Sequence, residues 1–115
     1  MPAKPDARAL LGSLIGTPIS TVTGRVNTVM RLEGDNAIVA TSRSPGGQPV
    51  PISWVQSGLE RLLETMEIEV SVPSLSYRSA FIGAVLLSLP DAVLVQVTPP
   101  HIRLIGPQLR SDSMK

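Results

Sequence analysis

The stretch "STVTGRVNTVMRLEGDNAIVATSRS", Ser20–Ser44, carries the clearest β-strand pattern in the chain. Apolar residues between Val26 and Leu32 follow an imperfect alternation, which is typical of a half-buried strand. "EGDN", Glu33–Asn36, is rich in residues that tolerate positive φ, and "AIVAT" follows as a return strand. The sequence therefore predicts a hairpin in which Thr28–Glu33 pairs with Ala37–Ser42.

A helix and a strand are predicted next along the chain. In "WVQSGLERLLETM", Trp54–Met66, apolar residues recur on one helical face, and Ser53 precedes the helix as a capping residue. "EIEVSVP", Glu67–Pro73, alternates strictly between apolar and polar residues, so it predicts a strand with one buried face.

Three further segments complete the predicted fold. "SLSYRSAFIGAVLLSL", Ser74–Leu89, predicts a second main helix that ends at Pro90, and "AVLVQV" predicts a buried strand with an extended segment after it. "DARALLGSLIG" predicts a short N-terminal helix capped by Asp6. The Gly- and Pro-rich "SPGGQPVP", Ser44–Pro51, predicts irregular structure, with a short extended segment at Val50–Ile52.

Together these segments indicate an α+β fold, with two main helices packed on one small, mainly antiparallel sheet. The 115 residues fit a single domain, residues 1–115, with an ordered core at about 7–105 and frayed termini.

Composition excludes several classes of protein. Charged residues make up 17% of the chain and the net charge is +1, so a polycationic DNA-coating protein is excluded and any nucleic-acid contact has to be a local patch. Aromatic residues make up only 3%, which argues against stacking of single-stranded bases. The chain has no cysteine, and therefore no disulfide or thiolate zinc site.

Hydropathy bears on location and assembly. No apolar run is long enough to span a membrane and no convincing signal peptide begins the chain, so we expect a cytoplasmic protein. Apolar residues make up 43% of the sequence, and this excess favours a homo-oligomer or a partner-binding surface.

Catalytic and metal-binding patterns are weak. The one histidine, His101, follows two prolines and has no nucleophile indicated beside it. Glu60 and Glu64 fall on the polar face of the predicted helix, and the strand acids Glu67 and Glu69 have no lysine after them as a nuclease site would. We therefore expect no enzymatic activity, no metal and no cofactor.

The loop "RSPGGQP" lacks the spacing and the Lys-Ser/Thr pair of a phosphate-binding P-loop. It is either a tight connection or a loop in which Arg43 touches a DNA backbone. Basic residues are nearly all arginine, eight against two lysines. Arginine suits phosphate and base-edge contacts, although a GC-rich genome produces the same bias.

The run "IEVSVPSLSYRSAFIGAVLLSLPDAV", with the amphipathic helix and "GRVNTVMRL" before it, resembles winged-helix-like accessory modules of bacterial, especially actinobacterial, restriction-endonuclease-related proteins. The resemblance covers about residues 22–98. It implies that the helix beginning near Ser76 reads DNA, with Ser76, Tyr77, Arg78 and Ser79 facing it. This sequence departs from the pattern because too few residues precede that helix for a full helix-turn-helix, and because the helix is unusually apolar.

Two hypotheses follow. The first is a non-enzymatic DNA-binding module in transcription control or restriction and defence, with phosphate contacts from Arg43, Arg25 and Arg31 and groove-edge contacts from Tyr77 and Arg78. The alternative is an assembly module that binds a second copy or another protein, because a helix that is apolar on all sides has to be buried. Its predicted homodimer interface consists of Phe81, Val85, Leu86 and Leu89. Many DNA-binding proteins are dimers, so the two are compatible.

Overall fold

The predicted hairpin is present in the structure, a computed structural model that describes residues 6–72 and 78–105. Strand β2 (Val26–Glu33) and strand β3 (Asn36–Ala40) pair antiparallel, and Glu33 lies opposite Asn36 across the turn. A bulge between Val29 and Arg31 interrupts the register, which explains the imperfect alternation in the sequence.

Two more strands extend this hairpin into an antiparallel sheet with the order β1-β2-β3-β4. Strand β1 (Pro18–Ser20) pairs with β2 and was not predicted. Strand β4 (Gln48–Pro51) pairs with β3, so the extended segment predicted at Val50–Ile52 is present but begins earlier, at Gln48, and ends at Pro51. The prediction of irregular structure was wrong for Gln48 and Pro49. The two prolines of β4 are tolerated because this strand lies at the edge of the sheet, where missing N–H donors leave no ladder bond broken.

The C-terminal strands form a second sheet, with the order β5-β7-β6. Strand β7 (Pro100–Leu104) lies in the middle, between β5 (Glu67–Glu69) and β6 (Ala92–Val97), and both pairings are antiparallel. The prediction of one small sheet was therefore wrong, although the α+β class is confirmed. Strand β5 also ends four residues before the predicted Pro73, at Glu69.

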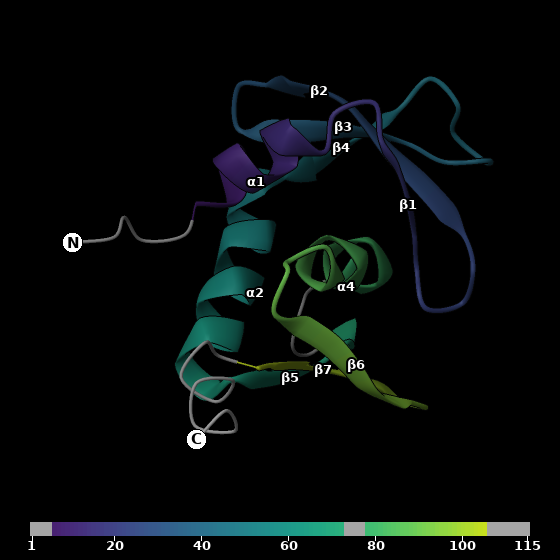
Figure 1. Cartoon of the computed structure of the whole chain (residues 1–115). Helices are drawn as coiled ribbons and strands as arrows, with labels where there is room; N and C mark the ends of the chain where they lie inside the picture. Colours follow the sequence, from purple (N-terminus) through teal and green to yellow (C-terminus); the bar gives the residue numbers. More distant parts are fainter. Residues whose placement is uncertain (1–5, 73–77, 106–115) are drawn as a thin grey trace.

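Helix α1 (Ala7–Ser13) and helix α2 (Ile52–Thr65) flank the two sheets at one end (Figure 1). Asp6 caps α1 as predicted, since its carboxylate accepts a hydrogen bond from the Arg8 N–H. The start of α2 differs from prediction, because Pro51 occupies the cap position and no side chain caps the helix. Instead the Ile52 N–H donates to the Asp35 carbonyl at 2.8 Å, which ties the helix to the β2–β3 turn.

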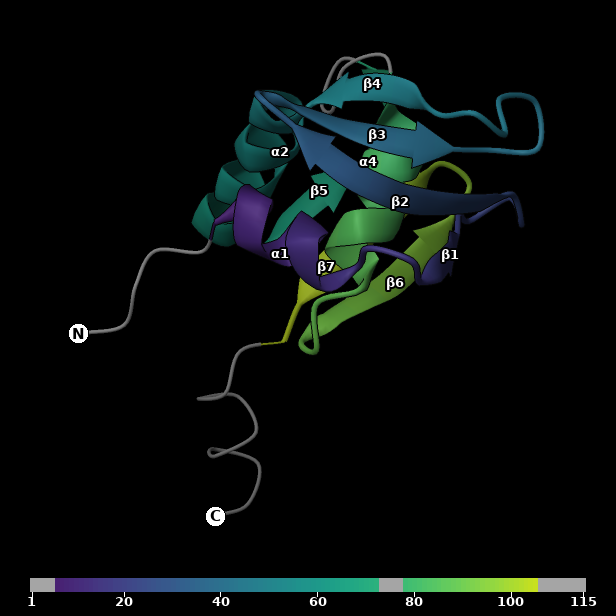
Figure 2. The same cartoon turned by 90° about the horizontal axis from the view of Figure 1, so that it is seen from above.

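The apolar face predicted for α2 points into the core, where Val55, Leu59 and Leu62 are fully or almost fully buried. Helix α4 (Ser79–Leu87) passes between the two sheets, as the two views in Figures 1 and 2 agree. All six residues from Phe81 to Leu86 are buried. The chain itself therefore covers this helix on both sides.

The core is aliphatic. Its largest fully buried side chains come from helices α1, α2 and α4 and from both sheets: Leu11, Leu59, Leu62, Ile82, Leu86, Ile102, Val29, Val39, Val50, Val55 and Val85. In the described ranges, no helix has both the length and the hydropathy that crossing a membrane requires.

Candidate nucleic-acid interface

Three arginines from three separate segments meet in a surface cleft of about 550 Å³. Arg25 comes from the β1–β2 loop, Arg43 from the β3–β4 loop, and Arg78 from the residue that precedes α4. Both loops lie at the end of the larger sheet that is farthest from α2 (Figure 1). We call this site the arginine cleft; its other polar lining residues are Thr21, Asn27, Thr41, Ser42, Ser44, Gln48 and Ser79.

Arg25 is held by a tight turn that begins at Thr21. The Thr21 N–H donates to the Arg25 carbonyl at 2.8 Å, and the Arg25 N–H donates back to the Thr21 hydroxyl at 3.1 Å. Thr21 is only 5% exposed. A buried side-chain hydroxyl thus fixes the backbone on which the exposed Arg25 side chain stands.

Arg43 is held in a closely similar way. The Thr41 and Ser44 backbones exchange two hydrogen bonds, at 3.2 and 3.1 Å, and the Ser44 N–H also donates to the Thr41 hydroxyl at 3.1 Å. The Gly47 N–H then donates to the Ser44 carbonyl at 2.9 Å. Both loops therefore use a threonine hydroxyl to support a tight turn that presents one arginine.

Arg78 occupies the N-cap position of α4, with φ of −105° and ψ of 40°. No side chain caps the helix and no acidic residue lies in its first turn, so the positive end of the helix dipole is not neutralised by the described residues around it. The Arg78 guanidinium Nη1 donates to the Gln48 Oε1 at 3.3 Å. This contact links the start of α4 to the first residue of β4.

The cleft is electropositive because its arginines lack acidic partners. None of the described lining residues is an aspartate or glutamate. Two arginines outside the cleft are neutralised by carboxylates: Arg31 pairs with Glu33, and Arg103 pairs with Glu67 at 3.0 Å. Within residues 6–72 and 78–105, neither Arg25 nor Arg43 forms such an ion pair. In a chain of net charge +1, this is a local concentration of positive charge.

The structure brings four of the predicted DNA-contacting residues together: Arg25, Arg43, Arg78 and Ser79 all line the cleft. Arg31 does not, because it lies farther along β2 and its guanidinium is engaged by Glu33. Two further residues that were predicted to face DNA, Ser76 and Tyr77, lie outside the described residues.

The predicted dimer-interface residues lie on α4 or just after it, and they pack into the core of the single chain. Phe81 is 2% exposed, and Val85 and Leu86 are completely buried. Leu89 is partly buried and packs against the same core. Burial of this apolar helix therefore needs no second copy, which removes the physical reason for placing a dimer interface there.

Sequence reasoning missed the residues that shape the cleft, namely Thr21, Thr41 and Gln48. The signal was present in "TVTGR" and "TSRS", two short Thr- and Ser-rich segments that each carry one arginine. Threonine and serine hydroxyls bond nearby backbone groups in turns, so such segments indicate an arginine on a rigid loop.

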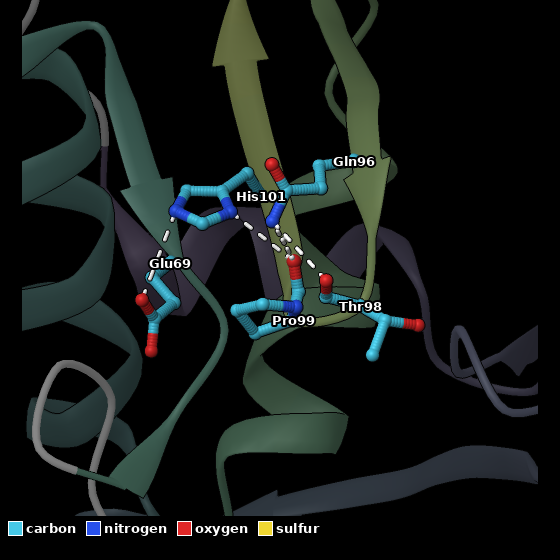
Figure 3. Close-up of polar contacts among 5 residues, drawn as sticks. All are labelled: Glu69, Gln96, Thr98, Pro99 and His101. Atoms are coloured by element: carbon cyan, nitrogen blue, oxygen red, sulfur yellow. Dashed lines mark hydrogen bonds and ion pairs between the residues drawn. The ribbon is translucent and has the colours of Figure 1, made fainter.

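His101 lies in a different part of the molecule, at the β6–β7 hairpin (Figure 3). Its Nε2 is 3.7 Å from the Glu69 Oε1, and its Nδ1 is 3.1 Å from the Pro99 carbonyl, to which Gln96 Nε2 also donates. In Figure 3 the Thr98 hydroxyl points away from the imidazole. These contacts fasten the hairpin turn and place no nucleophile at the ring among the residues drawn.

A search of the described residues finds no group of three histidine, aspartate or glutamate side chains that could hold a metal ion. Comparison with family models, curated proteins and solved structures finds no match to the chain. Function is therefore inferred from the geometry of the arginine cleft.

Proposed function

We propose that the protein is a non-enzymatic DNA-binding module that contacts the phosphates of duplex DNA through the arginine cleft. The observation that carries this proposal is the meeting of Arg25, Arg43 and Arg78 in one cleft without an acidic lining residue in the described chain. The guanidinium group offers donors in a planar fork that fits a phosphate, and serine and threonine hydroxyls and helix N-termini also bind phosphates.

The winged-helix resemblance is supported by the order of the C-terminal elements. Helix α2, strand β5, helix α4 and the β6–β7 hairpin follow one another, and the three strands form one sheet. The regulatory or restriction-associated setting that the resemblance implies belongs to this proposal.

The mode of DNA contact, however, differs from that of a groove-reading helix. Helix α4 is buried between the two sheets, so only its N-terminal end, from Arg78 to Phe81, lines the cleft. Contacts from one helix end and two loops favour phosphates over base edges. Because phosphate contacts carry no direct sequence information, we expect weak sequence preference and strong dependence on salt.

The experiment is a fluorescence-anisotropy titration of labelled duplexes of unrelated sequence, repeated at several salt concentrations. Three phosphate contacts predict a slope of log K against log salt of about −2.7. In the Arg78→Ala variant, loss of one contact reduces the slope by about 0.9. The same variant should bind about 10- to 150-fold more weakly, since a hydrogen bond to a charged group contributes about 1.5–3 kcal/mol.

Arg31→Ala is the matched control, because it removes the same charge from an exposed arginine that pairs with Glu33 outside the cleft. We expect Arg43→Ala and Arg25→Ala to behave like Arg78→Ala, and Arg31→Ala to leave both affinity and slope close to those of the wild type. Absence of duplex binding by the wild type at low salt would refute the proposal. An equal loss in Arg31→Ala would show that net charge, rather than the cleft, drives binding.

A further inference from the structure

In the described part of the chain the two sheets have four edge strands, and three of them are protected against pairing with another chain. Strand β1 has only three residues and begins with Pro18. Strand β4 contains Pro49 and Pro51, which have no N–H to donate. Strand β5 has three residues, of which Glu67 and Glu69 are charged. Short length, proline and charge are the features by which edge strands avoid intermolecular pairing.

Strand β6 is neither short, proline-containing nor charged, although a register shift between Leu94 and Gln96 interrupts its pairing with β7. It is six residues long, "AVLVQV", and contains neither proline nor a charged residue. On one side it pairs with β7, and it ends the order of its sheet on the other (Figure 2). Its apolar side chains are unusually open to solvent: Leu94 is 38%, Val95 is 44% and Val97 is 61% exposed.

We infer that β6 pairs antiparallel with β6 of a second copy of this chain, which joins the two smaller sheets into one continuous sheet across a twofold axis. The inference rests on the sheet edges and is independent of DNA binding by the arginine cleft. It also moves the homodimer interface away from α4, whose side chains the chain already buries.

A second copy is the occupant that best fits the chemistry of this edge. Strand β6 has no charged side chain that would attract an acidic or a basic peptide. Two copies of β6 can lie side by side without repulsion between like charges. The nearest acidic residue, Asp91, directly precedes the strand. An antiparallel pair therefore places the two copies of Asp91 at opposite ends of the junction.

The number of unprotected edges also fixes the size of the assembly. Each chain offers one such edge in its described part, and pairing uses it up, so the association is isologous and stops at a dimer. Six residues span about 20 Å, which makes a small interface. Small interfaces are weak, so we expect a dimer that forms reversibly as concentration rises.

The test is the mass in solution by light scattering over a range of concentrations. The wild type should rise from 12.2 kDa towards twice that mass. The double variant Val95→Lys, Val97→Lys places charge on the edge and should stay at the protomer mass, with an unchanged circular dichroism spectrum and melting temperature. Ile15→Lys is the matched control, because Ile15 is 45% exposed and lies outside β6; it should dimerise like the wild type.

A second measurement uses the absence of cysteine from the chain. Val95→Cys should give a covalent dimer with a short bis-maleimide crosslinker, because antiparallel pairing brings the two copies of a central strand residue close together across the twofold axis. Ile15→Cys should remain a protomer under the same conditions. A wild type that keeps the protomer mass at several hundred micromolar would overturn the inference and would leave the edge to a strand of a different protein. Dimers that persist in the double lysine variant, or open-ended aggregates of the wild type, would overturn it as well.

Discussion

Two adjacent glycines in the loop that carries Arg43 should respond very differently to substitution by alanine. Gly47 has a φ of +93°, and a Cβ added to it would lie 2.6 Å from the Ile38 Cγ2 and 2.8 Å from the Met30 Sδ. At Gly46 the φ is not in the left-handed range, and no described atom lies within 4 Å of an added Cβ. Gly46→Ala is therefore a matched control one residue away.

The cost of Gly47→Ala has two sources. A positive φ costs an L-residue about 1–2 kcal/mol, and overpacking of a filled core costs about 1–3 kcal/mol. Ile38 is β-branched and only 7% exposed, so it has little freedom to move, whereas the Met30 side chain is flexible and partly exposed. The free energy of unfolding should therefore fall by about 2–5 kcal/mol. Gly46→Ala should change it by less than about 0.5 kcal/mol.

Urea denaturation followed by circular dichroism measures both values, and the midpoint should shift at a constant m-value. On heating, we expect Gly47→Ala to melt at least about 8 °C below the wild type, at roughly 4 °C per kcal/mol for a domain of this size. If Gly47→Ala unfolds within 0.5 kcal/mol of Gly46→Ala, about the range of a neutral surface change, the close packing of this loop on β3 is refuted. The same result would contradict the inference that this loop holds Arg43 rigidly.

Two further predictions concern the helices. Gly83→Ala should destabilise the protein by about 1 kcal/mol, because its Cβ would lie 2.8 Å from a Val70 methyl and this overpacking outweighs the gain in helix propensity. In a Val70→Ala background, the same change should become stabilising. Additive effects in a double-mutant cycle measured by urea denaturation would contradict this contact. Asp6→Ala should lower the free energy of unfolding by about 1 kcal/mol, because α1 loses its N-cap. Asp6→Asn should retain most of the stability of the wild type, since asparagine also caps helices. Equal losses for the two variants in calorimetry would exclude capping as the cause.

The parts of the fold that sequence predicted are those determined by local pattern. The β2–β3 hairpin follows from alternation on either side of a turn, and the buried face of α2 follows from apolar residues at helical spacing. Strand β1 and the division into two sheets could not be predicted in this way. Strand β1 has only three residues and begins with a proline, so it carries too little pattern of its own. The division into two sheets depends on pairings between distant segments, such as Ile68 of β5 with Ile102 of β7, which no short window contains.

Within the site, residue type was easier to predict than position. Arg25, Arg43 and Arg78 were each identified, yet their meeting depends on how β1, β4 and α4 are arranged in space. The separate position of Arg31 was partly readable, since residues two apart in a strand share a face and Glu33 is two residues away. Gln48, which contacts Arg78, was not identified as a site residue, because the prolines that follow it in β4 are typical of a loop rather than a strand.

The uniform hydropathy of α4 explains both the architecture and the location of the remaining functional surfaces. A helix with an apolar stripe needs one packing partner, whereas six successive buried residues need cover on all sides. One small sheet covers one side, so a chain of this length either recruits a second copy or folds a second sheet over the helix. The structure has the second sheet, and the dimer interface predicted on α4 is thereby filled from within. What stays open to partners is the end of the helix, where Arg78 meets two arginine-bearing loops, and β6, the one edge in the described chain without proline or charge. The apolar composition favours self-association, and the residues from Phe81 to Leu86 are already buried by the chain itself, so we expect any self-association to act through β6.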